Sequence, residues 1–300
     1  MAEALVRWRQ KSVCLQADKR FKNSTSQIGV CIVSNKIVLI TGAASGIGHA
    51  TARNLASSGY RVFGGVRRPE SAGVVPGIEY VQMDVRDQNS VMSAVRSVLE
   101  KAGRIDVLIN NAGVSLVGPI EATSDAEAEA LFDVNVFGVL RVTRAVLPSM
   151  RSQGSGLVIN ISSVLGFLPA PFMGLYASSK HALEGLSESL DHEVRKMGVR
   201  VVLVEPSFTQ TKLDTNAIRT QAIINDYAAA LAQSIDTVQQ QVSNAPPPQE
   251  VAKKIVSIIE GKRHIRQPAD GRAKLLSVLR RFAPITQVDK SLRRAFGLQP

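Results

Sequence analysis

The feature that most constrains the fold is a regular alternation of short β-branched apolar runs with longer segments of helical period, from residue 36 onward. The runs predict six strands, at residues 36–41, 61–66, 79–83, 106–110, 156–162 and 199–205. The segments between them predict helices at residues 49–58, 90–101, 124–150 with a break near Asp133, and 177–197. Apolar strands alternating with helices are typical of a parallel sheet covered on both faces. We therefore predict a single-domain α/β fold, a doubly wound, Rossmann-like parallel sheet that binds ligands at the carboxyl ends of its strands.

Composition narrows the class of protein further. Of the 300 residues, 45% are hydrophobic and 20% are charged, which suits a folded domain with a sizeable core. Cys14 and Cys31 cannot form a disulfide framework, and no run of about 18 apolar residues predicts a membrane-spanning helix. We therefore expect a cytoplasmic protein.

The net charge of +11 comes from the two ends of the chain. Residues 1–35 carry six Lys/Arg and two Asp/Glu, and residues 261–300 carry ten and two, which leaves 20 bases and 21 acids between them. A nucleic-acid enzyme usually concentrates positive charge around its working cleft. Because the centre of the chain is nearly neutral, we expect no nucleic-acid partner.

The chain is expected to divide into three parts. Residues 1–35 predict a poorly ordered extension, whose basic composition leaves open an organellar presequence or a start codon set too far upstream. Residues 36–261 predict the folded domain, in which residues 207–245 would form a lid over the crevice. Residues 262–300 predict a basic amphipathic tail.

A glycine-rich turn at residues 41–48 joins the first predicted strand to the first helix. Glycine lets the backbone turn sharply and approach a pyrophosphate, whose charge meets the N–H groups and positive pole of the helix. The spacing Gly-x-x-x-Gly-x-Gly differs from the common dinucleotide fingerprint, and the lysine of a P-loop is absent. The turn therefore predicts a dinucleotide site rather than triphosphate hydrolysis.

The end of the second strand indicates which nicotinamide cofactor such a site prefers. An acid there binds the ribose 2′-hydroxyl of NAD, whereas arginine accommodates the 2′-phosphate of NADP. Here Arg67 and Arg68 follow Val66, with no acid at that position. Two guanidiniums could form charge-assisted bonds worth about 1.5–3 kcal/mol each, which favours NADP(H) over NAD(H). The alternative is a pair of solvated surface arginines.

Tyr176 and Lys180 lie one helical turn apart, so both side chains project from the same helical face. An isolated phenol titrates at about pH 10, and a neighbouring ammonium with an oxidised nicotinamide ring is expected to lower that pKa. Tyr176 could then exchange a proton with an alcohol or carbonyl oxygen. Ser163, at the end of the fifth predicted strand, could donate a hydrogen bond to the same oxygen.

Together these motifs resemble the short-chain dehydrogenase/reductase family, over about residues 36–261 and in its single-domain subgroup. The resemblance implies catalytic roles for Ser163, Tyr176, Lys180 and Asn135, of which Asn135 would bend its helix and hold a proton-relay water. It also implies a set of cofactor-binding residues in addition to Arg67 and Arg68: Gly42, Ser45, Gly46, Ile47, Gly48, Asp84, Val85, Asn110, Ala112, Gly113, Tyr176, Lys180, Pro206, Thr209 and Thr211.

The reaction that this resemblance implies is the interconversion of a carbonyl with a secondary or primary alcohol. NADPH would deliver hydride to the carbonyl carbon, Tyr176 would protonate the oxygen, and Lys180 would bind the ribose and lower the pKa of Tyr176. The alternative is a non-catalytic cofactor-binding sensor or scaffold on the same fold. One position departs from the family, because Ser207 stands where glycine is usual. A positive φ there would cost a serine about 1–2 kcal/mol of strain.

Further sequence features bear on the substrate and on the partners of the protein. Residues 182–190 resemble family members that act on steroids, retinoids and other lipophilic molecules, so we expect a small lipophilic carbonyl or alcohol as substrate. Apolar side chains before Tyr176 could line its pocket or belong to the ordinary core: Phe167, Leu168, Phe172, Met173 and Leu175. The resemblance also favours a homodimer or homotetramer formed through the helices near Asn135 and Lys180.

Two features remain outside this scheme. Apolar and basic residues alternate at residues 271–282, as in an amphipathic helix that could pack on the domain, on a second subunit or on an anionic bilayer. Of these, we expect packing on protein rather than peripheral contact with a membrane. The four histidines lack metal-ligand spacing, so we expect no metal: His49, His181, His192 and His264.

Overall fold

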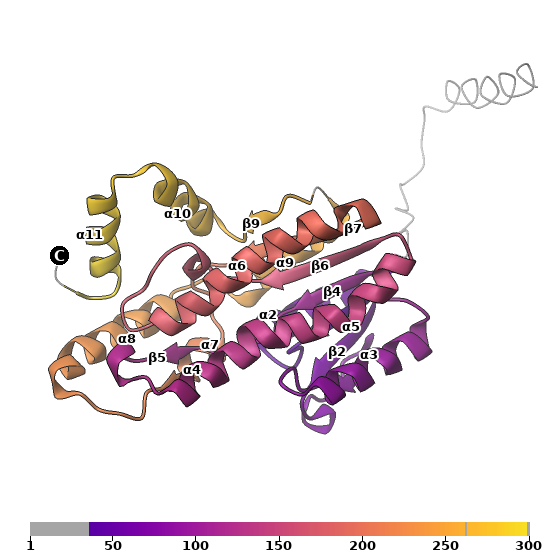
Figure 1. The fold of residues 1–300 in the computed structure, drawn as a ribbon, viewed down its shortest axis with the longest axis horizontal. Coiled ribbons are helices and arrows are strands. Elements are labelled where there is room, and N and C mark those ends of the chain that lie inside the picture. The colour runs from indigo at the N-terminus through magenta and orange to yellow at the C-terminus, as the bar shows by residue number, and fades with distance from the viewer. Residues whose placement is uncertain (1–35, 262, 299–300) are drawn as a thin grey trace, which may run out of the picture. The chain divides into compact units, whose positions relative to one another are not determined.

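The computed structural model describes residues 36–261 and 263–298, and the predicted extension at residues 1–35 lies outside them. One seven-stranded sheet has the order β3-β2-β1-β4-β6-β7-β9, and each neighbouring pair is parallel (Figure 1). The strands are β1 (Ile37–Thr41), β2 (Arg61–Val66), β3 (Ile78–Gln82), β4 (Val107–Asn110), β6 (Gly156–Ile161), β7 (Val199–Glu205) and β9 (Arg266–Pro268). The predicted doubly wound α/β fold is confirmed.

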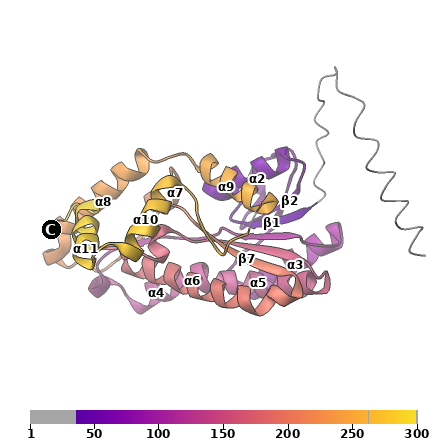
Figure 2. The same cartoon turned by 90° about the horizontal axis from the view of Figure 1, so that it is seen from above.

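Helices cover both faces of the sheet (Figure 2). One face carries α3 (Gln88–Ala102), α5 (Val139–Ser152) and α6 (Gly174–Val194), and the other carries α2 (Gly46–Ser57) and α9 (Pro248–Glu260). Within β1, Leu39 belongs to the first core cluster, whereas Val38 and Ile40 belong to the second. Since successive side chains of a strand point to opposite faces, an unbroken apolar strand is needed to fill both layers.

The break predicted near Asp133 is a change of helix type. Helix α4 (Asp125–Phe132) starts with a capping box in which Ser124 and Glu127 bond each other's backbone N–H groups. A π-helical turn (Asp133–Gly138) then leads into α5. Such turns often occur at functional sites, and this one carries Asn135.

All six predicted strands are present, with ends shifted by at most one residue. The prediction was wrong at the start of two helices, because α2 begins at Gly46 and α6 at Gly174 rather than at residues 49 and 177. It also missed β9, whose three residues offer no apolar alternation and which pairs with β7. Strand β9 therefore joins the segment after residue 262 to the main sheet.

The chain after β7 returns over the carboxyl edge of the sheet. Residues 207–245, which we call the 207–245 segment, contain α7 (Lys212–Thr215), β8 (Ile218–Arg219) and α8 (Ala228–Ser243). Strand β8 pairs with β5 (Leu116–Val117), which follows β4. After β9 come α10 (Gly271–Phe282) and α11 (Ile285–Ala295). Within residues 36–261 and 263–298, no helix combines the length and hydropathy needed to cross a membrane.

Candidate active site

The turn between β1 and α2 is shaped for close contact with a ligand. Gly42 and Gly46 have φ values of 68° and 55°, a region that residues with a side chain rarely adopt. A Cβ atom on Gly48 would lie 2.3 Å from Asn111 Nδ2 and 2.5 Å from Gly42 O. Ser45 makes no side-chain capping bond and the first turn of α2 holds no acid, so its N–H groups suit an anion. Ile47 lies partly exposed in the same turn.

Two side chains that the sequence analysis did not single out hold this turn in place. Thr41 Oγ1 accepts hydrogen bonds from Asn111 N and Ala112 N, both at 3.0 Å. Asn111 Nδ2 donates to Thr41 O at 3.0 Å and Gly42 O at 3.1 Å. The segment after β4 is therefore bonded to the glycine turn, which brings Ala112 and Gly113 beside it.

The side chain of Asn110, a predicted cofactor-binding residue, is buried and bonded to other side chains of the protein. Its side chain is 3% exposed, and its Nδ2 donates to Thr143 Oγ1 at 3.1 Å and Asn160 Oδ1 at 2.9 Å. Asn160 in turn donates to Ser187 Oγ at 2.8 Å. The Asn110 side chain thus belongs to a buried network joining β4, α5, β6 and α6.

Arg67 and Arg68 follow β2 directly, and both are exposed at the carboxyl edge. Arg67 is close enough to help lower the pKa of Asp84, whose main partner is Arg86. Arg86 Nη2 and Nε contact the two Asp84 oxygens at 2.6 and 3.0 Å. The resemblance assigns the Asp84 carboxylate to the cofactor, but Arg86 already neutralises it. The next residue, Val85, packs against Gly138.

Asn135 lies buried in the π-helical turn between the sheet and α6. Its Oδ1 accepts from Val114 N at 2.9 Å, and its Nδ2 donates to Val114 O at 2.9 Å and Ser179 Oγ at 3.1 Å. The amide therefore joins the segment after β4 to the helix that carries Tyr176 and Lys180. This agrees with a positioning role.

The three remaining predicted catalytic residues meet at the carboxyl end of β6. Ser163 caps a 3₁₀ turn, Val164–Gly166, by accepting from Leu165 N at 3.1 Å. Tyr176 and Lys180, on α6, are 5% and 6% exposed. Lys180 Nζ donates to Ile161 O at 2.9 Å and lies 5.7 Å from the centroid of the Tyr176 ring. The hydroxyl, phenol and ammonium thus face one small region.

The surroundings that the chain itself provides raise the pKa of Tyr176. Burial raises it, the charge of Asp214 on α7 raises it further, and only a hydrogen bond with the Ser163 side chain lowers it. Burial also lowers the pKa of Lys180 to about 8, although the charge of the Glu184 carboxylate acts to raise it. Because burial outweighs the hydrogen bond with Ser163, the chain alone does not make the phenol acidic.

Ser207 does not carry the strain that its departure from glycine suggested. Phe172 is the one non-glycine residue with positive φ in the described part of the chain. The Ser207 N–H and Oγ both donate to Asp270 Oδ2, at 3.0 and 2.9 Å. Asp270 also caps α10, since its Oδ1 accepts from Ala273 N at 2.8 Å. The serine therefore ties the segment after β7 to α10.

The other residues predicted after β7 lie on the same edge. Pro206 O accepts from Val164 N at 2.9 Å, next to Ser163. Thr209 Oγ1 donates to Ser207 O at 3.2 Å. A Cβ on Gly46 would lie 3.4 Å from Thr211 Cγ2, so Thr211 lies over the glycine turn.

Behind the site, a buried acidic pair was not predicted. Arg266 Nη1 contacts a carboxylate oxygen of Glu184 and lies 2.9 Å from Glu205 Oε1. Ser162, next to Ser163, bonds the other Glu184 oxygen. Burial raises the pKa of Glu205 to about 7 and also raises the pKa of Glu184. These carboxyls are distant in sequence, so only the fold pairs them.

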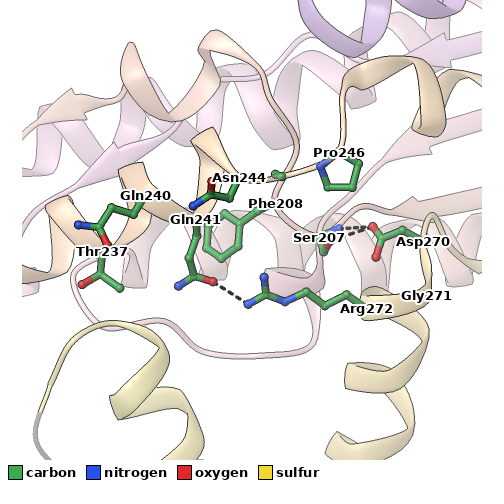
Figure 3. A pocket seen from close by; sticks show the side chains of 11 residues that line it. Ser207, Phe208, Thr237, Gln240, Gln241, Asn244, Pro246, Asp270, Gly271 and Arg272 are labelled. Atoms are coloured by element: carbon green, nitrogen blue, oxygen red, sulfur yellow. Dashed lines mark hydrogen bonds between the residues drawn. The ribbon is translucent and has the colours of Figure 1, made fainter.

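Tyr176 forms part of an apolar cluster rather than a polar one. The apolar residues that precede it all pack there or beside it, except Phe172, whose ring lies edge-on to Tyr227 with centroids 6.4 Å apart. A cavity of about 430 Å³ lies on the other side of Phe208, between α8 and the start of α10 (Figure 3). Arg272 reaches across it to Gln241, at 2.6 Å. The described residues include no group of three His, Cys, Asp or Glu side chains placed to hold a metal.

The comparisons with known proteins identify the family. Residues 36–222 match the family described as short chain dehydrogenase, and the chain belongs to it. It is 36% identical over 230 residues to 3-ketodihydrosphingosine reductase of Bacteroides thetaiotaomicron, covering 76% of this chain and 84% of that protein. It is 41% identical over 187 residues to human 17-beta-hydroxysteroid dehydrogenase type 1, covering 58% and 56%. The resemblance to this family, with steroid-type relatives, is confirmed.

Solved structures with the same fold bind either cofactor. A short chain dehydrogenase/reductase of Burkholderia phymatum in complex with NAD gives a TM-score of 0.74 at 27% identity, covering 89% of this chain and 98% of that one. A short chain dehydrogenase of Burkholderia cenocepacia in complex with NADP gives 0.69 at 25% identity, covering 86% and 97%. The protein is thus an NAD(P)-dependent oxidoreductase acting on CH–OH or C=O groups.

Proposed function

We propose that the protein is an NADP(H)-dependent oxidoreductase that interconverts a lipophilic ketone or aldehyde with its alcohol, using Tyr176 as acid and base. The observation that carries this proposal is the meeting of Ser163, Tyr176 and Lys180 at the carboxyl end of β6. The glycine turn lies at the same edge of the sheet. A binding protein without catalysis has no need of a buried phenol and ammonium beside a hydroxyl.

The residues of the chain divide the chemistry among them. The first turn of α2 would bind the pyrophosphate of the cofactor, and Arg67 with Arg68 would bind a 2′-phosphate. When bound, the nicotinamide supplies or accepts the hydride. Tyr176 would donate its proton to the substrate oxygen, and its raised pKa keeps it protonated at neutral pH, as reduction requires. Ser163 would hold that oxygen.

A lipophilic substrate agrees with the surroundings of Tyr176. Its neighbours Leu116, Val164, Leu168 and Met173 are buried and apolar, as is typical of small-molecule sites. One similar protein is named as a reductase of 3-ketodihydrosphingosine and another as a hydroxysteroid dehydrogenase. Assembly through the helices near Asn135 and Lys180, and a cytoplasmic location, stay predictions.

The test is a spectrophotometric panel. Oxidation of NADPH and of NADH is followed with apolar ketones and aldehydes of increasing size, and the reverse reaction with the matching alcohols. We expect turnover with apolar carbonyls, a higher kcat/KM with NADPH, and a large loss in Ser163→Ala. Cofactor binding without turnover of any compound would favour the alternative function, a non-catalytic sensor. Turnover that Ser163→Ala leaves unchanged would argue against the proposed site.

A further inference from the structure

Helix α10 carries an apolar stripe that the fold leaves exposed. Leu275, Val278, Leu279 and Phe282 recur at i, i+3, i+4 and i+7, the spacing of one helical face. Their exposed fractions are 58%, 49%, 44% and 75%, and that of Ile285, which begins α11, is 68%. We call these five residues the α10 stripe. Large apolar side chains grouped in this way mark an interaction surface.

The opposite face of α10 is the one that packs on the domain. Ala273 is fully buried, and Leu276 packs against the apolar cluster that contains Tyr176. Arg280 Nε donates to Phe167 O at 3.2 Å. With about 3.6 residues per turn, these positions lie roughly half a turn from the stripe. The stripe therefore points away from the domain, and packing on the chain's own core does not cover it.

Exposed bases border the stripe. Lys274 and Arg281 lie along one edge of it, and the Arg281 guanidinium is 5.7 Å from the centroid of the Phe282 ring. Together, α10 and α11 contain seven Lys/Arg and one Asp. A second copy of the chain, packed stripe to stripe, would bring these bases together, and their repulsion would oppose the contact.

The size of the stripe also favours lipid over protein. A helix of 12 residues is about 18 Å long and about 10 Å wide. Its exposed face buries far less than the roughly 1,200–2,000 Å² of a stable protein interface. An amphipathic helix at a bilayer needs only to insert its apolar face by about 5–10 Å, with its bases among anionic headgroups.

In contrast to the expectation from the sequence, which favoured packing on protein, we infer that α10 docks the enzyme on an anionic membrane surface, with the stripe at the acyl boundary and Lys274 and Arg281 at the headgroups. This surface is separate from the proposed chemistry, so either can fail alone. The start of α10 also borders the cavity beside Phe208, which Gly271 and Arg272 line (Figure 3). Docking would thus bring that cavity next to the bilayer, in which apolar molecules dissolve.

The test is sedimentation of the full chain with vesicles of phosphatidylcholine, alone or with about three parts in ten of phosphatidylserine. We expect binding to the anionic vesicles that weakens with added salt. The double variant Leu279→Ser/Phe282→Ser should bind at least about tenfold more weakly. The double variant Lys274→Glu/Arg281→Glu should lose the preference for phosphatidylserine.

Matched controls come from elsewhere on the surface. Val74→Ser removes a side chain that is 100% exposed, and Arg96→Glu reverses an exposed base on α3. Both should bind vesicles as the unaltered protein does, and cofactor binding, followed by fluorescence, should be the same in all variants. Vesicle binding that persists in the Leu279→Ser/Phe282→Ser protein overturns the inference, as does no binding at all. Concentration-dependent dimerisation that this variant abolishes would also overturn it, in favour of a second copy.

Discussion

The glycine turn after β1 and the 207–245 segment lie at the same edge of the sheet, yet they are held in different ways. In the turn, the backbone packs so closely that a Cβ on Gly48 would lie 2.5 Å from Gly42 O and 2.3 Å from the side-chain atom Asn111 Nδ2. The 207–245 segment is held by side chains from elsewhere, as Ser207 bonds Asp270 and Gln221 N donates to Glu127 Oε1 at 3.0 Å. The turn thus depends on close backbone packing in which a side chain has no room, whereas the 207–245 segment depends on individual side-chain contacts that can be removed one at a time.

The largest effect is expected from a side chain placed in the turn. Gly48→Val would force apart Gly42 O and Asn111, so cofactor affinity should fall by more than about 100-fold. Fluorescence titration with NADPH measures this. Gly185→Ala is the control, because a Cβ there meets nothing within 4 Å. It should leave affinity unchanged and stabilise α6 by about 0.5–1 kcal/mol. If Gly48→Val bound NADPH as tightly as the unaltered protein, close backbone packing in the turn would not be what cofactor binding requires.

Arg67→Asp tests the cofactor side without altering its backbone. Losing a charge-assisted bond of about 1.5–3 kcal/mol should shift the ratio of kcat/KM for NADPH over NADH by at least tenfold towards NADH. Arg96→Asp, at an exposed position of α3, serves as the matched charge change. A ratio that stays the same in Arg67→Asp would show that the 2′-phosphate is not bound there.

The buried acidic pair predicts how stability depends on pH. The pKa of Glu205 is raised from 4.5 to about 7, so the folded state holds a proton that the unfolded chain releases. The stability from this group is therefore present below about pH 4.5 and lost as the pH rises towards 7, by about 3 kcal/mol. Urea unfolding across this range should show the decline, and Glu205→Gln should flatten it. Glu188→Gln, at the exposed end of the Arg266 contacts, should keep most of it.

The smallest effect is expected where Ser207 meets Asp270. Ser207→Gly removes the hydroxyl bond but keeps the N–H bond, so stability should fall by about 0.5–1.5 kcal/mol. The KM for NADPH should rise by only a few fold. The control is Ser277→Ala, which removes a hydroxyl bonded to Lys274 O within α10. A large loss of cofactor affinity in Ser207→Gly would mean that the 207–245 segment also helps to bind the cofactor.

The same contrast explains what the sequence could predict. The strands, the glycine turn and the pairing of Tyr176 with Lys180 depend on neighbours close in sequence, so pattern and spacing sufficed. Asp270 meets Ser207 across 63 residues, and no local signal marks it. The burial that raises the pKa of Tyr176 was not predicted, because spacing shows its distance from Lys180 but not the burial of both. The burial of Tyr176 depends on how distant segments pack around it, among them the 207–245 segment, and local sequence pattern does not describe that packing.

The most direct test of the account is the turnover of Tyr176→Phe with NADPH and a saturating ketone, measured beside its affinity for NADPH. The variant keeps the ring and removes the proton donor, so kcat should fall by about 10²–10⁴, far more than the affinity for NADPH. Turnover within a few fold of the unaltered enzyme would contradict the claim that this phenol carries the proton.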